Sequence, residues 1–363
     1  MSELKRTILY QAHLDAGATM VDFGGWDMPI QYPEGIIAEH LYCRRHCGIF
    51  DVSHMGRIDV EGPDQVAFLQ HVLSSNVLAL DLNQAQYCII PDANGYAIDD
   101  AYLYRFEEGK YFLVINAGNI DKDWAHLMNE AKNFDVKLTN VSDKYAAIAV
   151  QGPESKKILM TLSGGRQLTP ENVKNALNSL TMEGKPVRIA KTGYTGEPIG
   201  YELYCNSEDA RYFWDRLIEL GAKPTALGAR DTTRMEAALP LYGHEMGECE
   251  MGGEIQIYAV PLAKFAVSFD EAKGDFIGRE PLRKQFEALK KIMNRDYSSI
   301  EDLPYRIQPI YLEGKGVLRK GFPIYCKDAW AEGKQIGYVT SGTMIPYYKT
   351  EGQGLESVFT DET

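Results

Sequence analysis

The 363-residue sequence is poor in cysteine and has no long hydrophobic run. Its six cysteines are widely spaced, which excludes a scaffold built on disulfides. No window approaches 18 consecutive apolar residues, so we expect no membrane span. The first 17 residues have neither the apolar segment nor the cleavage pattern of a signal peptide. These absences predict a cytoplasmic protein.

Basic residues and phosphate-binding loops are also scarce. Lys and Arg total 38 against 51 Asp and Glu, which gives a net charge of −13. A field of that sign opposes binding to nucleic acid and to anionic membranes, so we expect neither as a partner. No G-x-x-x-x-G-K-[ST] motif occurs, and no G-x-G-x-x-G motif opens a helix. The glycine-rich loops that hold nucleotide phosphates are therefore not expected.

The composition that remains is that of a globular enzyme, with 45% hydrophobic residues, 25% charged residues and 22 tyrosines. The length predicts two or three domains. Strand and helix patterns alternate without regular βαβ units, which predicts an α+β fold with mainly antiparallel sheets. After about residue 270, a basic amphipathic helix over 279–295 precedes short strands separated by Gly and Pro. This change indicates a separate β-rich domain.

Local patterns place several elements. Strands are expected over 86–92, 97–106 and 111–116, with Asn94-Gly95 as a hairpin turn between the first two. Gly48 is expected to end a helix that starts at residue 35. Ser207 is expected to cap a helix over 208–220, and a further helix from residue 228 should break at Pro240.

Two adjacent carboxylates, Asp99 and Asp100, lie inside the predicted strand 97–106, where acidic residues are uncommon. Successive strand residues point to opposite faces, so Asp100 shares a face with Tyr102 and Tyr104 while Asp99 lies on the other face. One carboxylate can therefore enter an aromatic-lined cavity and hold or receive a proton of a nitrogen substrate. A solvated hairpin strand would give the same pattern.

The segment 191–202 links two expected strands and contains Gly193, Gly196 and Gly200. These glycines allow sharp turns and a close approach of the backbone to a ligand. Glu202 could accept paired hydrogen bonds from a flat amidine-like edge, such as that of a pterin. An ordinary tight loop is the alternative.

Arg230 and Arg234 lie four residues apart on one predicted helix, where an arginine can bind a ligand carboxylate with both its N–H groups. Pairing with acidic residues of the same helix is the alternative. His46 lies between Cys43 and Cys47 and could form half of a metal site, but no second half follows, so a structural role is favoured and no metal is expected. His54 is a single candidate base.

Taken together, an ordered set of segments resembles the T-protein, or aminomethyltransferase, family of the glycine cleavage system. The similarity spans nearly the whole chain. The segments that carry it are FGGWDMPIQY (23–32), HCGIFDVSHMGRIDVEG (46–62), NGYAIDD (94–100), INAGN (115–119), VQGP (150–153), TGYTGE (192–197), LGARDTTRMEAALPLYGHE (227–245), DFIGRE (275–280) and GYVTSGT (337–343).

The resemblance implies a reaction and a fold. The family transfers the one-carbon unit of an aminomethyl group, carried on the lipoyl arm of H-protein, to tetrahydrofolate. The products are 5,10-methylenetetrahydrofolate, ammonia and dihydrolipoyl H-protein. The implied fold has three lobes with the folate in a central hole. The implied partners are therefore lipoylated H-protein and folate.

The resemblance also implies roles for single residues. The family's essential aspartate falls on Asp100, its pterin-binding glutamate on Glu202 and its folate-contacting arginine on Arg230. Further positions that line the folate pocket fall on Met55, Tyr87, Asn116 and Tyr194, and Phe265 stands where the family usually has a tryptophan.

The C-terminal part departs from the family pattern. The family continues past 337–343 with more barrel strands and a tyrosine that touches the folate, and residues 284–305 look like an insertion. We therefore expect two parts. Residues 1–270 would form a folate-binding module of two interleaved α+β lobes. Residues 271–363 would form an incomplete C-terminal β-barrel-like domain.

Three other functions share parts of this pattern. A folate-dependent demethylase acting on N-methyl or S-methyl substrates would use the same pocket without H-protein. A folate-binding relative that supports iron–sulfur cluster assembly carries a cysteine in a Lys-Gly-Cys motif, and the matching stretch here, 191–194, has none. A scaffold that binds folate or H-protein without catalysis is the third.

Overall fold

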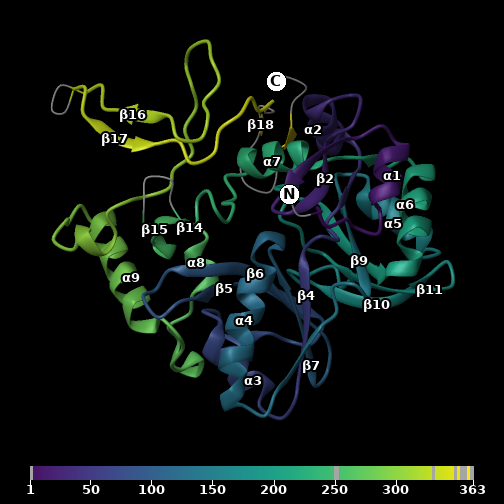
Figure 1. Cartoon of the computed structure of the whole chain (residues 1–363), viewed down its shortest axis with the longest axis horizontal. Helices are drawn as coiled ribbons and strands as arrows, with labels where there is room; N and C mark the ends of the chain where they lie inside the picture. Colours follow the sequence, from purple (N-terminus) through teal and green to yellow (C-terminus); the bar gives the residue numbers. More distant parts are fainter. Residues whose placement is uncertain (1–2, 249–252, 329–331, 347–349, 352–357, 360–363) are drawn as a thin grey trace.

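The computed structural model describes residues 3–248, 253–328, 332–346, 350–351 and 358–359. Two mainly antiparallel sheets form its centre (Figure 1). The first sheet has the strand order β5-β6-β7-β4-β8. Its strands are β4 (Gly56–Glu61), β5 (Gln84–Pro91), β6 (Ala97–Glu107), β7 (Lys110–Ile115) and β8 (Lys137–Asn140). The three strands expected between residues 86 and 116 are thus confirmed as β5, β6 and β7.

The second sheet has the order β10-β11-β12-β9-β3-β13, in which β13 pairs with β3 in parallel and the other pairs are antiparallel. Its strands are β3 (Gly48–Asp51), β9 (Tyr145–Gln151), β10 (Leu177–Met182), β11 (Lys185–Ala190), β12 (Gly200–Asn206) and β13 (Lys223–Pro224). Separate from both sheets, β1 (Thr19–Phe23) and β2 (Trp26–Gln31) form a hairpin. The expected α+β class with mainly antiparallel sheets is confirmed.

Helices cover the outer face of each sheet, because their apolar sides and the outward-facing strand residues bury one another. On the first sheet, α3 (Gln65–Val72) and α4 (Ile120–Glu130) supply Phe68, Leu69, Val72 and Leu127 to one buried cluster. On the second sheet, α1 (Tyr10–Asp15), α5 (Ser155–Leu162) and α6 (Ala210–Glu219) supply Ala12, Leu159, Phe213 and Trp214 to another.

The inner faces of the two sheets pack against each other through a third buried cluster. Tyr104 of β6 and Tyr204 of β12 belong to it, whereas Ala101 and Leu103 belong to the cluster under α3 and α4. The alternation expected for residues 97–106 is therefore correct. It turns Asp100 towards the second sheet and leaves Asp99 on the helix-covered side.

Helix α2 (Ile36–Arg45) and helix α7 (Leu227–Glu236) pack together beside the hairpin β1–β2. Described residues between Met246 and Leu303 form a fourth cluster with Ile89 and Ala97 of the first sheet. Its elements are β14 (Gly247–Glu248), β15 (Glu254–Ile255), α8 (Ala263–Ala266) and α9 (Arg279–Met293). This cluster includes residues on both sides of position 270, and the division of the chain at that position stays a prediction.

The described residues near the C-terminus form the hairpin of β16 (Pro323–Tyr325) and β17 (Gln335–Tyr338) and the short pair of β18 (Thr350–Glu351) and β19 (Val358–Phe359), with no closed barrel among them. Figure 1 shows the β16–β17 hairpin projecting away from the two sheets. No helix in the described parts of the chain is long and apolar enough to cross a membrane.

Two expected helix boundaries are wrong. Gly48 does not end α2 but begins β3, and a Cβ added there would lie 2.6 Å from Thr225 Oγ1, so the strand pair needs glycine for close packing. Ser207 does not cap α6 through its side chain, because its hydroxyl donates to the carbonyl of Asp143 and a 3-10 turn over Ser207–Asp209 precedes the helix.

Candidate functional site

The inner faces of the two sheets, α7 and the C-terminal segment enclose a mostly apolar cavity of about 350 Å³. Asp100 lines it from the first sheet, Glu202 from the second, Arg230 from α7 and Thr343 from the C-terminal segment. A largely apolar cavity with a few converging polar groups is the usual form of a small-molecule site. Segments far apart in the sequence thus form the walls of one cavity.

Asp100 is held by two neighbouring side chains. Tyr87 donates its hydroxyl hydrogen to Asp100 Oδ2 over 3.0 Å, and Asn116 Nδ2 donates to Asp100 Oδ1 over 2.8 Å. Tyr87 also stacks on Tyr194, with ring centroids 5.9 Å apart. These contacts fix the orientation of the carboxyl group at the cavity wall.

Burial, with the negative charge of Asp99 next to it, raises the pKa of Asp100 to about 7, although the bonds from Tyr87 and Asn116 favour the charged form. A carboxyl group with a pKa near the working pH exchanges a proton in either direction at little cost. Asp100 is therefore suited to acid–base work.

Glu202 lies on the matching inner face of β12. Its Oε2 accepts hydrogen bonds from Tyr104 (2.7 Å), Thr192 (2.5 Å) and Tyr204 (3.4 Å). Its other oxygen, Oε1, receives no donor from the described residues. The carboxylate is thus fixed through one oxygen and presents the other to a ligand.

Arg230 lies near Glu202 in the same cavity. Its guanidinium donates to Thr195 Oγ1 over 2.9 Å and lies 5.8 Å above the Phe50 ring. Burial lowers the pKa of Arg230, and the charge of Glu202 opposes this effect. Neither Asp231 nor Glu236 pairs with it in the described structure, so the intrahelical alternative does not hold for Arg230.

His54 also lines the cavity, with the edge of its ring packed on Phe23. Its Nδ1 is buried and has no hydrogen-bond partner in the described part of the chain. Burial lowers the pKa of His54 to about 4, since little compensates for the lost hydration of the charged ring. At neutral pH it is a neutral imidazole.

The structure brings most of the sequence-predicted residues together. Met55, Asn116 and Tyr194 line the cavity beside Asp100, Glu202 and Arg230. Tyr87 reaches the site through its bond to Asp100 rather than as part of the cavity lining. Phe265 does not join them: it lies on α8 and is 71% exposed. The proposed replacement of a folate-lining tryptophan by Phe265 is therefore not supported by its position.

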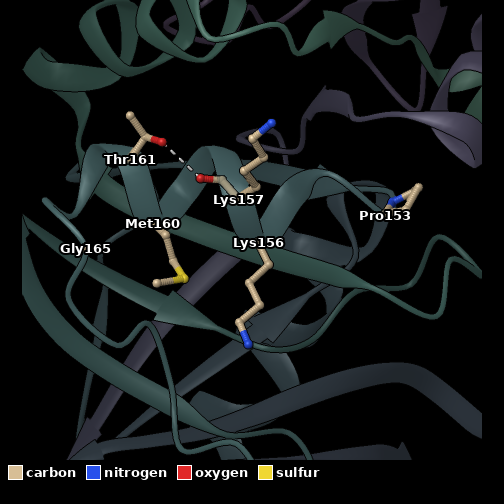
Figure 2. Close-up of a pocket in the computed structure, with 6 residues that line it drawn as sticks. All are labelled: Pro153, Lys156, Lys157, Met160, Thr161 and Gly165. Carbon is tan, nitrogen blue, oxygen red and sulfur yellow. Dashed lines mark hydrogen bonds between the residues drawn. The ribbon is translucent and has the colours of Figure 1, made fainter.

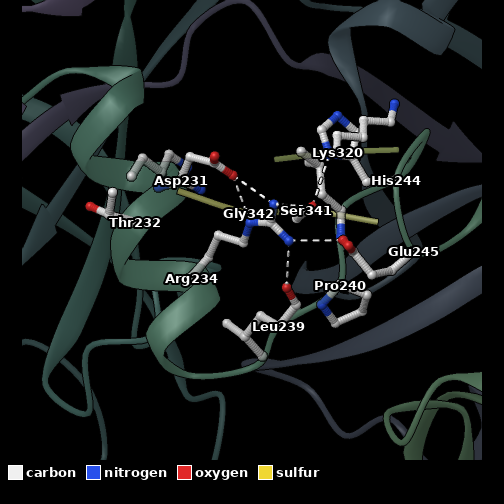
Figure 3. A network of polar contacts seen from close by, with 12 residues as sticks. Asp231, Thr232, Arg234, Leu239, Pro240, His244, Glu245, Lys320, Ser341 and Gly342 are labelled. Atoms are coloured by element: carbon white, nitrogen blue, oxygen red, sulfur yellow. Dashed lines mark hydrogen bonds and ion pairs between the residues drawn. The ribbon is translucent and has the colours of Figure 1, made fainter. Parts of the chain in front are cut away.

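Pairing with an acidic residue of the same helix, the alternative given for Arg230, is found instead at Arg234. Arg234 is buried and binds Asp231, Glu245 Oε2 (2.9 Å), the carbonyl of Leu239 (3.1 Å) and Ser341 Oγ (2.8 Å) (Figure 3). Ser341 also bonds to His244 Nδ1 over 2.9 Å. This network ties α7 to the C-terminal segment at the edge of the cavity.

The glycines of 191–202 approach protein atoms rather than the cavity. A Cβ on Gly193 or Gly200 would collide with the side chain of Gln151. Gly196 has a positive φ of 86°, and a Cβ there would lie 2.6 Å from the carbonyl oxygen of Thr233 on α7. The loop therefore needs glycine to pack on the second sheet and α7, which differs from the expected ligand contact.

The residues 43–47 hold no metal-like arrangement. Cys43 and Cys47 are buried free thiols, and burial raises the pKa of both. His46 lies 3.3 Å from Glu154. Within the described ranges, no group of three or more His, Cys, Asp or Glu residues could hold a metal ion.

A second hollow of about 610 Å³ lies on the surface beside α5 (Figure 2). Its lining includes Lys156, Lys157 and Met160. Figure 2 shows the two lysine side chains extending away from each other, and Lys156 is paired with Glu171 over 3.0 Å. Since no acid–base or ligand-binding groups converge there, the central cavity is the candidate active site.

Sequence reasoning missed several residues of the cavity and its support. Thr192 and Tyr204 hold Glu202, and Thr343 lines the cavity from the C-terminal segment. The alternation along β12 could have indicated Tyr204, which lies two residues after Glu202. No local signal marks Thr192 or Thr343, because their roles depend on which segments meet in the fold.

Comparison with known proteins shows the family of the chain. A family model described as the GCVT N-terminal domain matches residues 9–258. An aminomethyltransferase of Deinococcus deserti is 41% identical over 346 residues, covering 94% of this chain and 86% of the relative. One from Thermus thermophilus is 39% identical over 359 residues, covering 99% of this chain and 92% of the relative.

A solved structure gives the same result. The crystal structure of glycine cleavage system aminomethyltransferase T from Bartonella henselae matches with a TM-score of 0.75 and 29% identity, covering 93% of this chain and 85% of that chain. These matches confirm the resemblance found in the sequence. The chain therefore belongs to the GCVT family, the folate-dependent aminomethyltransferases of the glycine cleavage system.

Proposed function

We propose that this chain transfers the one-carbon unit of an aminomethyl group on lipoylated H-protein to tetrahydrofolate in the central cavity. The observation that carries the proposal is the meeting of Asp100 and Glu202 in one apolar cavity, each fixed by neighbouring hydroxyl or amide groups. One carboxyl group is poised for proton exchange, and the other offers a free oxygen to a ligand donor.

The residues on each side of the cavity have separate roles in the proposed reaction. Glu202 Oε1 accepts an N–H of the pterin edge, while Tyr104, Tyr204 and Thr192 hold the carboxylate in place. Arg230 contacts the ligand beside Glu202. Their combined effect is to orient the folate so that its accepting nitrogen lies at Asp100, which turns a bimolecular encounter into a positioned reaction.

Asp100 accepts and donates the protons that move during the transfer. The carbon forms bonds to N5 and N10 of tetrahydrofolate, and its bonds to the lipoyl sulfur and to the amino nitrogen break. The two folate N–H hydrogens end on the dihydrolipoyl thiol and on ammonia, so the atoms balance. Asp100 accepts a proton from a folate nitrogen and returns one to a leaving group, which its pKa of about 7 permits.

The decisive assay measures 5,10-methylenetetrahydrofolate formed from aminomethyl-lipoyl H-protein. We expect Asp100→Asn to lower kcat by about 10²–10⁴-fold, the usual range for loss of an acid–base group, while folate affinity is retained. Asp81→Asn, the same change at an exposed loop position, is the matched control. Turnover by Asp100→Asn at the wild-type rate would refute the assignment.

The same assay tests the competing reaction. A panel of N-methyl and S-methyl donors replaces H-protein as the carbon source. Activity with these donors alone would identify a demethylase. Folate binding with no turnover from any donor would identify a non-catalytic scaffold.

A further inference from the structure

A second acidic residue, Asp123, lies behind the wall that carries Asp100. It is in the first turn of α4, on the outer side of the first sheet, and its exposed fraction is 0%. Neither Asp123 Oδ1 nor Asp123 Oδ2 receives a hydrogen bond from an N–H or O–H group of the described residues. A buried ionised carboxylate without hydrogen-bond donors is strongly disfavoured. The usual stabilisation of a negative charge at the start of a helix therefore does not account for the burial of Asp123.

The group that faces Asp123 is the carboxylate of Asp99, which lies within hydrogen-bonding reach. Asp99 is itself fully buried and accepts three N–H groups: the backbone N–H of Asn116 (2.9 Å), Asn116 Nδ2 (2.8 Å) and Asn119 Nδ2 (2.6 Å). Two buried carboxylates in contact cannot both be charged. Asp99 has the donors that stabilise an anion, so the proton of the pair belongs on Asp123.

The surrounding charges agree with this assignment. Lys122, the neighbouring cation, favours ionisation of Asp123, but its ammonium is bonded to the carbonyl of Ile98 (2.6 Å) and to Tyr242 Oη (2.7 Å). From α3, His71 is paired with Glu130. Burial, with the charges of Asp99 and Asp100, raises the pKa of Asp123 to about 10.

Asp99 is connected to the cavity through one amide. Asn116 Nδ2 lies 2.8 Å from Asp99 Oδ1 and 2.8 Å from Asp100 Oδ1, so a single side chain bridges carboxyl groups on the two faces of β6. The position of Asn116 depends on Asp99, and the orientation of Asp100 depends on Asn116. Whatever fixes Asp99 therefore acts on Asp100 through the sheet.

We propose that Asp123 is a positioning residue in its neutral acid form: its carboxyl O–H donates to Asp99, and this bond fixes Asp100 through Asn116. The pair then holds one negative charge behind Asp100 instead of two. The link to catalysis rests on the proposed transfer reaction, whereas the protonated acid is a property of the resting protein.

Infrared spectroscopy of the resting protein tests the proton directly. We expect a carboxylic acid C=O band that persists at pH 8.5, where Asp100 is ionised, and that Asp123→Asn removes. If Asp123→Asn does not fold, the Asp100→Asn protein carries the test, because the band at pH 8.5 must remain in it. Absence of the band at pH 8.5 would overturn the proposal and leave the transfer reaction untouched.

The pH profile of the transfer tests the positioning. The amide that Asp123→Asn introduces is neutral and still donates to Asp99, so we expect the acid limb of kcat/KM to stay within about 0.3 pH unit of wild type. Asp123→Leu has no donor, and we expect its kcat to fall at least about tenfold, with little change in folate affinity. A limb that moves down by a unit or more in Asp123→Asn would mean that Asp123 is charged and would refute the assignment. Absence of transfer in a wild-type protein that shows the band would refute the proposed function alone.

Discussion

Asp100 shows how two local effects set the chemistry of a single residue. Burial and the charge of Asp99 place the pKa of Asp100 at about 7, well above that of an exposed aspartate. Because the pKa is raised, the carboxyl group is protonated below that pH and cannot accept a proton from the folate. We therefore expect kcat/KM to fall about tenfold per pH unit below roughly pH 6.5 and to level off above about pH 7.5.

Steady-state rates of methylenetetrahydrofolate formation between pH 5.5 and 9 measure this limb. Asp100→Asn serves as the control, since its residual rate should not show the limb. A wild-type profile that is flat through pH 6 would contradict the role of Asp100.

Glu202 has a different task, and its substitution should act on binding. In Glu202→Gln the side-chain oxygen still accepts the hydroxyls of Tyr104 and Thr192, but the free position facing the ligand becomes an amide NH₂ that cannot accept a donor. Loss of a charge-assisted hydrogen bond costs about 1.5–3 kcal/mol, so we expect the Kd for tetrahydrofolate to rise about 10- to 150-fold. Calorimetric titration measures it.

Glu208→Gln, at an exposed position near the start of α6, is the matched control and should leave the Kd unchanged. An unaltered Kd in Glu202→Gln would remove Glu202 from the ligand contact.

Helix α7 is the element on which the cavity and the C-terminal segment both depend. It presents Arg230 to the cavity and uses Arg234 to bind Glu245 and Ser341. Arg234→Met leaves Glu245 buried without its cation, and breaking a buried pair in this way costs about 3–5 kcal/mol of unfolding free energy. Burial raises the pKa of Glu245, but the Arg234 charge and the hydrogen bonds that Glu245 accepts together lower it. Without the Arg234 charge, the pKa of Glu245 rises in the variant, so the loss should shrink as the pH falls and this carboxyl becomes protonated.

Denaturant unfolding measures this difference. Arg211→Met removes an arginine whose ion pairs with Asp15 and Asp215 are half exposed, and it should cost less than about 1 kcal/mol. Equal losses in both variants would show that the Arg234 network adds no specific stability.

The side-chain alternation of strands is the feature that a sequence predicts most directly. The alternation of β6 placed Asp100 on the tyrosine face because the side-chain period of a strand is fixed by its geometry. The glycines of 191–202 gave a clear signal for close packing, but the partner was Gln151 and α7 rather than a ligand. A glycine in such a loop indicates that another group packs closely against its backbone, and only the three-dimensional structure identifies that group.

At the scale of the whole molecule, ligand binding should stabilise every part that forms the cavity. A ligand that binds only the folded state at 100 times its Kd adds about 2.7 kcal/mol to the unfolding free energy. We expect tetrahydrofolate to give this gain in wild type and in Asp100→Asn. At the same concentration, a 100-fold weaker Glu202→Gln should gain only about 0.4 kcal/mol. Thermal unfolding with and without the ligand measures the gain, and equal gains in wild type and Glu202→Gln would contradict a binding site at Glu202.

Some parts of the molecule could be predicted from the sequence and others could not. The α+β class, the central hairpins and most of the expected site residues follow from periodicity and from an ordered set of motifs. Phe265 could not be placed from the sequence, because no strand or helix pattern around it indicates which way it faces, and in the structure it lies exposed on α8. Asp123 was missed because an acidic residue in the first turn of a helix is common. Only the packing of α4 against β6 buries its carboxyl group where no N–H or O–H group of the described residues donates to it.

The cavity wall runs from Phe23 to Thr343. During synthesis, a ribosome releases Phe23 long before Thr343, so no shorter nascent chain can present the complete wall. Binding competence should therefore arise late and abruptly as the chain emerges, after the two sheets have already formed. Reduced folate would then stabilise only those chains in which the segment around Thr343 has already packed into the cavity wall.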